Sequence, residues 1–157
     1  MRRSRLRGSA FEELINNSNN IYLESSKALV QKIATPIKPI SLGKCGMITC
    51  AFFEKKSTVD YIGISKKKMF CFDAKETSQK SLPLKNIHKH QIEFMSDFEK
   101  HGGTSFLLVN FTFNQTFFYL SFKELFDAYK NFEYRKSISC KNFKHEIFLD
   151  KQNFLDY

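Results

Sequence analysis

Three features are missing from this sequence of 157 residues: tryptophan, a pair of cysteines in the CxxC spacing, and any long apolar run. Without CxxC, a structural zinc site has no support, and we interpret the four cysteines as reduced thiols. No apolar run of membrane-spanning length occurs, and no apolar segment follows the basic residues 1–5, which excludes a membrane span and a secretion signal. We therefore expect a cytoplasmic protein with no membrane partner.

Acidic residues are also scarce relative to basic ones, with 16 against 25, which gives a formal charge of +9. Such an excess of positive charge is typical of proteins that bind polyanions, and nucleic acid is the first candidate. The codon bias of an AT-rich genome is a second explanation, since it also produces abundant lysine, phenylalanine, asparagine and isoleucine without tryptophan. Charge alone therefore does not decide the function.

The composition is that of one globular domain, with 42% hydrophobic and 26% charged residues in a chain long enough for one core. Helical spacing of apolar residues predicts a first helix near residues 9–34, with a weak middle at the asparagine-rich residues 16–20. Pro36 and Pro39 end this helix, and the basic stretch up to Gly46 is expected to be a loop or extended arm.

Strand-forming residues dominate the next part of the chain. Three strands are predicted at residues 47–54, 58–65 and 68–74, because each is rich in β-branched or aromatic residues. Short turns that carry lysine join them, so we expect an antiparallel meander.

The second half of the chain mixes helical and strand patterns, with no element predicted from residue 134 onward. A capping box of the S-x-x-E form opens its last predicted helix. The elements are a helix at 83–100, a hairpin of 105–111 with 116–120, and a helix from 121 towards 132. The resulting order α-β-β-β-α-β-β-α indicates an α/β domain.

Two carboxylates and a lysine are expected to meet on the strands at 58–65 and 68–74. A two-residue turn at Lys66 and Lys67 would place Asp60 opposite Asp73. Like charges in that position destabilise a sheet unless a cation or a shared proton lies between them. Lys75 is two residues from Asp73 and so shares its face. Hard oxygen ligands for Mg²⁺ beside a lysine are what phosphodiester hydrolysis requires, so the pattern indicates a nuclease.

Two alternatives stay open on spacing alone. An isolated D-x-K more often lies on an exposed face, where Lys75 would make a surface ion pair. The register is also open by one residue, because a turn of Lys66 and Lys67 lacks the glycine that two-residue hairpins prefer.

Several short motifs follow one another in order along nearly the whole chain. They are Arg7-Gly8, Phe11-Glu12, Ile15-Asn16, Thr35-Pro36, Ser57-Thr58-Val59-Asp60-Tyr61-Ile62-Gly63, Phe72-Asp73-Ala74-Lys75-Glu76-Thr77, Pro83-Leu84, His88-Lys89-His90-Gln91-Ile92 and Arg135-Lys136-Ser137-Ile138. In these motifs the sequence resembles the RecU family of Holliday junction resolvases, in the PD-(D/E)xK nuclease superfamily. The resemblance implies an α/β fold with a restriction-endonuclease-like core, a mixed central sheet flanked by helices, and a protruding stalk.

The resemblance also implies roles for individual residues. The side chains implied to hold Mg²⁺ or Mn²⁺ are Thr58, Asp60, Asp73 and Gln91. Lys75 is implied to stabilise the transition state, and Glu12 on the first helix is implied to contribute to catalysis with Asp60, Asp73 and Lys75.

The sequence departs from the family pattern in two places. The family usually has glutamate where this chain has Asp73, which is shorter by one methylene, so the change bears on the affinity for the metal. The segment between Thr35 and Asp60 is shorter than its counterpart, which forms the stalk that enters the junction. That difference bears on selectivity for junctions.

Basic residues outside the site are expected to contact the phosphate backbone of DNA. They lie in the first residues of the sequence, in the stalk segment and in the turn between two predicted strands. These residues are Arg2, Arg3, Arg5, Arg7, Lys38, Lys44, Lys66 and Lys67.

The expected organisation is a basic arm at 1–8, a nuclease domain at 9–138 with the stalk near 36–50, and a C-terminal extension at 139–157. The function implied is that of a homodimeric, metal-dependent endonuclease that resolves four-way DNA junctions by paired symmetric nicks, leaving 5′-phosphate ends, in recombination and repair. A branch-migration helicase and a strand-exchange recombinase are further implied partners. The alternatives are a less selective branched-DNA nuclease and a junction-binding protein with weakened catalysis that modulates recombination.

Overall fold

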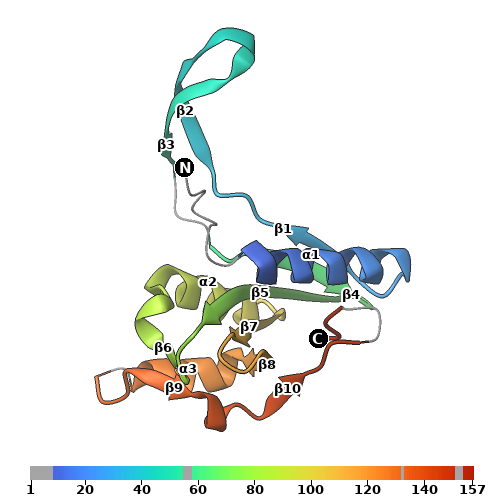
Figure 1. Cartoon of the computed structure of the whole chain (residues 1–157), viewed down its shortest axis with the longest axis vertical. Coiled ribbons are helices and arrows are strands. Elements are labelled where there is room, and N and C mark those ends of the chain that lie inside the picture. Colours follow the sequence, from blue (N-terminus) through green and yellow to red (C-terminus); the bar gives the residue numbers. More distant parts are fainter. Residues whose placement is uncertain (1–8, 55–57, 132, 151–153) are drawn as a thin grey trace.

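A six-stranded sheet forms the centre of the computed structural model, which describes residues 9–54, 58–131, 133–150 and 154–157 (Figure 1). The order of its strands is β1-β4-β5-β7-β8-β10. Only β5 and β7 run parallel, so the sheet is mixed. The strands are β1 (Leu29–Lys32), β4 (Tyr61–Ser65), β5 (Lys68–Thr77), β7 (Thr104–Phe111), β8 (Thr116–Ser121) and β10 (His145–Ile147).

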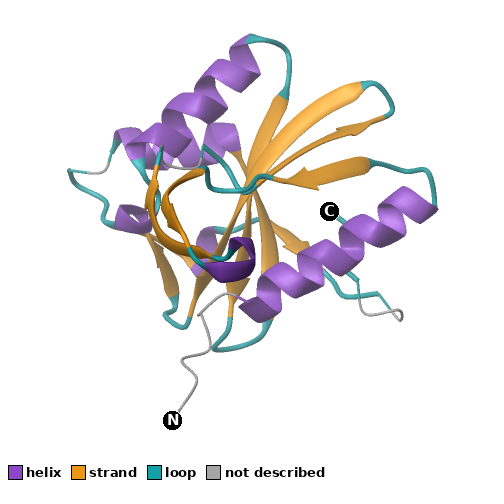
Figure 2. Ribbon diagram, turned by 90° about the horizontal axis from the view of Figure 1, so that it is seen from above, coloured by secondary structure: helices purple, strands orange, loops and turns teal. Residues whose placement is uncertain are grey.

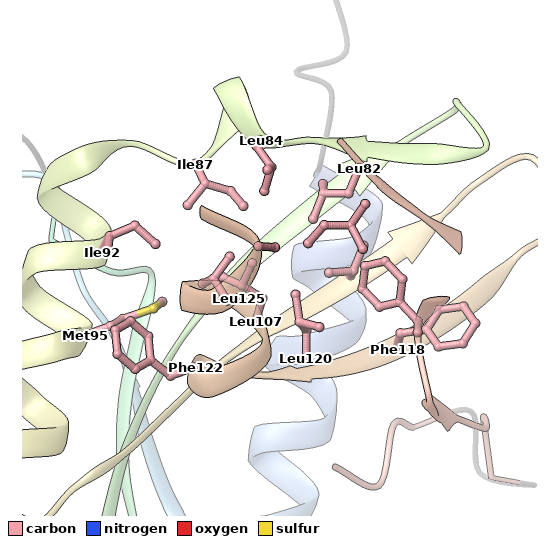
Figure 3. Packing of buried hydrophobic residues seen from close by; sticks show 14 of the residues in the cluster. Leu82, Leu84, Ile87, Ile92, Met95, Leu107, Phe118, Leu120, Phe122 and Leu125 are labelled. Carbon is pink, nitrogen blue, oxygen red and sulfur yellow. The ribbon is translucent and has the colours of Figure 1, made fainter. Parts of the chain in front are cut away.

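Helices cover both faces of this sheet (Figure 2). One face is covered by α1 (Ser9–Glu24), whose Phe11 and Ile15 belong to a cluster with Phe72. The other face is covered by α2 (Lys89–Lys100) and α3 (Phe122–Lys130), which bury a second cluster against β7 (Figure 3). The predicted α/β class, a mixed sheet flanked by helices, is confirmed. In the described part of the chain, no helix combines the length and the apolar character needed to cross a membrane.

The first helix is shorter than predicted, because it ends at Glu24 and the expected residues 29–32 form β1 instead. Ser26 has a φ of 55° and ends the helix, with the N–H of Lys27 donating to Tyr22 O at 2.9 Å. The asparagine-rich middle stays helical through tertiary packing. There, Ser18 is fully buried and accepts a hydrogen bond from the N–H of Leu155 at 2.9 Å.

A hairpin protrudes from the domain, and we call it the stalk (Figure 1). It consists of β2 (Ile37–Leu42), the short 3₁₀ turn η1 (Lys44–Gly46) and β3 (Ile48–Phe53). The stretch up to Gly46, predicted as a loop or extended arm, is extended and forms one strand of this hairpin. The predicted meander was wrong, because β3 pairs with β2 and not with β4. Pro39 fits in β2 because that strand has an unpaired edge.

The second helix begins at Lys89 rather than at residue 83. Pro83 ends the short strand β6 (Ser81–Pro83), which pairs with β9 (Ser137–Ser139) in the region without a predicted element. A 3₁₀ turn, η2 (Leu84–Asn86), then follows, and a similar turn, η3 (Cys140–Asn142), follows β9. The predicted hairpin of β7 and β8 is confirmed, as is the capping box of α3.

Candidate active site

The turn between β4 and β5 fixes the register of the site. Lys66 and Lys67 are its two central residues, with φ values of 46° and 69°. Ser65 pairs with Lys68 and Tyr61 pairs with Phe72 at the other end of the hairpin. Asp60 therefore comes directly before the last pair and Asp73 directly after it. The predicted register is confirmed.

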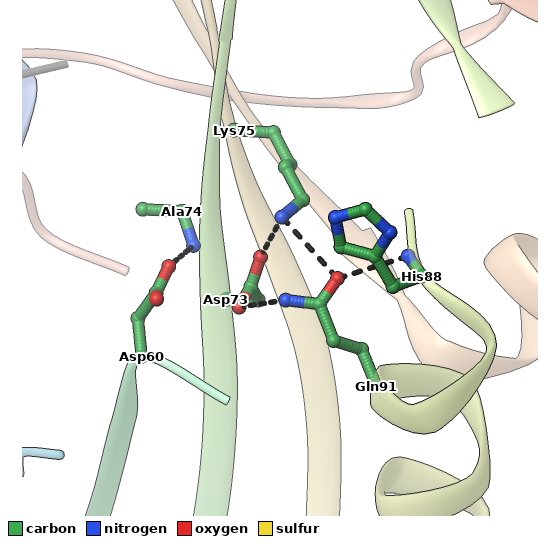
Figure 4. A network of polar contacts seen from close by, with 6 residues as sticks. All are labelled: Asp60, Asp73, Ala74, Lys75, His88 and Gln91. Atoms are coloured by element: carbon green, nitrogen blue, oxygen red, sulfur yellow. Dashed lines mark hydrogen bonds and ion pairs between the residues drawn. The ribbon is translucent and has the colours of Figure 1, made fainter. Parts of the chain in front are cut away.

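Asp60 is held by the backbone of both neighbouring strands. Its carboxylate Oδ2 accepts a hydrogen bond from the N–H of Ala74 at 2.9 Å (Figure 4). Its backbone oxygen accepts from the N–H of Ile33, which follows β1, at 2.8 Å. These bonds keep the Asp60 side chain directed towards β5.

Asp73 is the only one of the site carboxylates in the described residues that is fully buried. Its Oδ1 accepts a hydrogen bond from Gln91 Nε2 at 2.8 Å, and its Oδ2 forms an ion pair with Lys75 Nζ. Burial raises the pKa of Asp73 to about 7, against the lowering effect of Lys75 and with a further raising effect of Asp60. Asp73, which lies beside a second carboxylate and a lysine, therefore changes its protonation state near neutral pH.

Gln91 joins α2 to this group (Figure 4). Its Oε1 accepts a hydrogen bond from the N–H of His88, the N-cap of the helix, at 3.1 Å. The same oxygen lies 3.4 Å from Lys75 Nζ. Gln91 therefore caps the helix and positions Asp73 and Lys75 at the same time.

A polar cavity of about 640 Å³ opens beside Lys75. Glu12 of α1 and Glu76 of β5 contribute carboxylates to its lining, and Lys85 contributes a further charge. Glu12 also forms an ion pair with Lys32 of β1 at 2.5 Å. Lys75 is thus reached from an open, polar side of the molecule.

The remaining predicted residues lie at different distances from this group. Thr58 is half-buried and two residues before Asp60. Lys66 and Lys67 lie at the opposite end of β4 from Asp60, across five strand residues, or roughly 17 Å. Lys38 and Lys44 lie on the stalk. The predicted DNA contacts Arg2, Arg3, Arg5 and Arg7 fall outside the described residues.

The donor set fits a hard divalent cation. Two carboxylates and an amide oxygen are ligands that Mg²⁺ accepts. Burial is the main reason that the pKa of Asp73 is raised, and a cation near Asp60 would relieve the repulsion between the two carboxylates that adds to it. In the described residues, no three side chains of His, Cys, Asp or Glu gather into a metal-binding group. A cation held here would therefore rely on Asp60 and Asp73.

Sequence reasoning missed two contributions to this site. One is the N–H of Ala74, a backbone group with no sequence signal. The other is Lys32, whose partner Glu12 was identified while Lys32 itself was assigned to a helix. The register of β1 on β4, in which Lys32 lies opposite Tyr61, brings it to Glu12.

The mixed sheet, the helices on both faces and the group of Asp60, Asp73 and Lys75 define the class: an α/β protein with a carboxylate and lysine site on its central sheet. Comparison with known families makes the assignment specific. The family model described as Recombination protein U matches residues 6–157. This chain belongs to the RecU family.

Curated relatives agree with this assignment. The Holliday junction resolvase RecU of Shouchella clausii is 39% identical over 84% of this chain and 66% of its own length. The proteins of the same name from Pediococcus pentosaceus and Streptococcus gordonii are 39% and 34% identical, over 89% and 95% of this chain. The chain spans 73% and 77% of their lengths.

One solved structure also resembles the fold. It is the Holliday junction resolvase Hjc of Archaeoglobus fulgidus, with 9% identity, a TM-score of 0.44 and coverage of 75% of each chain. A likeness of this size is too small to bear on function.

Proposed function

We propose that this protein is a metal-dependent endonuclease that cleaves four-way DNA junctions. The observation that carries the proposal is the convergence of Asp60, Asp73, Lys75 and Gln91 from β4, β5 and α2 in a chain of the RecU family. These relatives are named Holliday junction resolvases, and the formal charge of +9 suits a DNA substrate.

Asp60 and Asp73 would hold Mg²⁺ or Mn²⁺, with Thr58 and Gln91 completing the site. The cation supplies activation of the attacking water and neutralises charge that develops on the phosphate. Water attacks phosphorus in line, the bond from phosphorus to the 3′ oxygen breaks, and the products are 5′-phosphate and 3′-hydroxyl ends.

Lys75 is placed to stabilise the transition state. Its side chain is 16% exposed and lines the cavity, so its ammonium group can donate to a phosphoryl oxygen that enters there while little water screens the interaction. Gln91 holds the lysine in position from the other side. Glu12 faces the same cavity and would act on groups that enter it.

Paired symmetric nicks require two such sites, so we propose a homodimer as the active form. The stalk, with Lys38 and Lys44, and the arginines near residue 1 would hold the junction arms. A branch-migration helicase and a strand-exchange recombinase are proposed partners, and the cytoplasm is the proposed location.

The test is cleavage of a labelled mobile four-way junction in Mg²⁺ and in Mn²⁺. Asp60→Asn and Lys75→Ala are each expected to lower the cleavage rate at least a thousandfold, because each removes charge needed in the transition state. Binding to the junction in EDTA should change less than threefold. Full cleavage by the pure Lys75→Ala protein would contradict the assignment of the site.

Two alternatives have specific support. The shorter side chain at Asp73 is fully buried and has both oxygens engaged by Lys75 and Gln91, which favours a junction-binding protein with weakened catalysis. Tight junction binding without cleavage in either metal would establish it. The shortened stalk favours a less selective nuclease of branched DNA, and equal cleavage of junction, flap and linear duplex would identify that activity.

A further inference from the structure

A second cavity lies beside the turn of Lys66 and Lys67, at the end of β4 and β5 remote from the carboxylates. Its volume is about 510 Å³, within the range of sites that hold small molecules or single nucleotides. Its walls are mostly apolar. The rings in them belong to Tyr22, Phe70, Phe106, Tyr119 and Tyr157.

These rings are fixed against one another. The ring centroids of Phe106 and Tyr119 lie 4.7 Å apart, and those of Tyr22 and Tyr157 lie 5.4 Å apart at nearly a right angle. Phe70, Tyr119 and Tyr157 are only half-buried, so part of each ring borders the cavity. A rigid aromatic wall can receive a flat ring with little loss of side-chain entropy.

Positive charge surrounds the cavity. Lys27 follows α1, and Lys66 and Lys68 belong to the β4–β5 turn and strand, so lysines approach from two elements. Asp156 is the single acidic residue among the described lining residues. The surplus of two charges selects an anionic ligand.

The backbone conformation of the turn is unfavourable for its two lysines. Lys66 and Lys67 both have positive φ, which Asn and Gly adopt in two-residue hairpins far more readily than lysine does. The left-handed conformation is unfavourable for every residue that carries a Cβ atom. Two residues kept in unfavourable conformations that also carry charge indicate a function for the charge.

Asp156 distinguishes between anionic ligands. Its Oδ1 accepts a hydrogen bond from the hydroxyl of Tyr22 at 3.0 Å, which holds the carboxylate in the wall. A carboxylate there can accept from the amino group of adenine, cytosine or guanine. It would repel the carboxylates of an acidic peptide, so the lining favours a nucleotide.

We propose that this cavity binds one unpaired nucleotide of a DNA strand, with its base on the aromatic wall and its neighbouring phosphates on Lys27, Lys66 and Lys68. Aromatic rings combined with lysines are the usual means of binding single strands. The site is roughly 17 Å from Asp60 along β4 and requires no metal. It is therefore separate from the site of cleavage.

The first test measures the affinity of the full chain for a fluorescein-labelled, single-stranded oligodeoxyadenylate in EDTA. The variant Lys66→Asn/Lys67→Gly removes two charges, and Asn-Gly is a favourable pair for a two-residue turn. It should bind the labelled strand about five- to tenfold more weakly than the wild type. The control Lys123→Gln/Lys141→Gln removes two exposed charges elsewhere and should bind within twofold. Equal losses in both double variants would overturn the proposal, since net charge alone would then explain binding.

The second test uses the absence of tryptophan from the sequence. Tyr119→Trp places a single fluorophore in the wall, and Thr104→Trp places one at an exposed lining position. In at least one variant that melts cooperatively, the strand should quench tryptophan emission, and an abasic strand of equal length should quench less. Equal quenching by both strands, or none, refutes base stacking. Quenching by an acidic phenylalanine peptide alone would assign the cavity to a protein partner and overturn the proposal.

Discussion

Asp73 combines complete burial, a neighbouring carboxylate and a lysine partner in one residue. Burial acts against its ionised form more strongly than Lys75 supports it, so its pKa rises from 3.8 to about 7. Such a group stabilises the fold below its ordinary pKa, and this contribution is lost as the pH rises through 7. Above about pH 7, the protein therefore holds an unfavourable buried charge.

Asp73→Asn should reveal this cost. Relative to the wild type in EDTA, the free energy of unfolding of the variant should increase by roughly 2–4 kcal/mol as the pH rises from about 4 to above 7, because only the wild type gains the buried charge. Urea denaturation at a series of pH values measures the difference. Parallel stability curves for the two proteins would show that Asp73 does not titrate in this range.

The three charged residues of the candidate site were easier to predict than the groups that hold them in place. Asp60, Asp73 and Lys75 were predicted to converge because the β4–β5 register follows from a two-residue turn, and they do. The contacts from Lys32 and from the N–H of Ala74 depend on pairing with other strands. Such pairing leaves no mark in the local sequence pattern.

At the scale of elements, the β4–β5 turn carries two lysines in a backbone conformation that lowers the stability of the fold. Lys66→Asn/Lys67→Gly should raise the free energy of unfolding by about 1–2 kcal/mol, because both new residues accept positive φ without strain. Thermal melts at neutral pH measure the gain. Exchanging the lysines for alanines offers a comparison, and it should give no gain, since alanine has the same backbone restriction.

The two strands of the stalk contribute no buried residue to the hydrophobic core. Every residue of β2 and β3 is exposed, so its removal should leave the domain intact. Joining Pro36 to Glu54 through a short glycine linker is feasible, because the N–H of Glu54 donates to Pro36 O at 3.0 Å. We expect the melting temperature to change by less than about 3 °C and the preference for junction over duplex to fall at least tenfold, by gel-shift titration. Unchanged preference would show that the stalk does not select junctions.

The predicted boundaries of helices and strands were wrong where pairing with a strand distant in sequence overrode the local propensity. The helical pattern of residues 9–34 continues past Glu24, yet Val30 and its neighbours pair with β4. The helix α2 begins at Lys89 and not at residue 83, because Pro83 pairs with Ser137 in a short sheet. The local sequence pattern contains no sign of a partner so distant in sequence. By contrast, the capping box at Ser121 and Glu124 is local, and it marked the start of α3 correctly.

For the whole molecule, the metal is expected to contribute to stability as well as to chemistry. At a Mg²⁺ concentration about tenfold above its dissociation constant, the wild type should melt roughly 3–6 °C higher than in EDTA, because the cation binds only the folded chain. Asp60→Asn should show less than a third of this shift. An equal shift in the variant would mean that Mg²⁺ acts elsewhere. Differential scanning calorimetry provides the measurement.

The two ends of the stalk return to the domain close to Asp60. Pro36 and Glu54 are hydrogen-bonded at its base, and Ile33, three residues before Pro36, donates its N–H to the backbone oxygen of Asp60. If the stalk holds a junction arm, as proposed, tilting the hairpin would act on a segment that is hydrogen-bonded to the backbone of Asp60. Under the proposed function, junction binding and cleavage would therefore be coupled through this hydrogen bond, and a poorly fitting DNA would be rejected by misplacing Asp60, without loss of affinity.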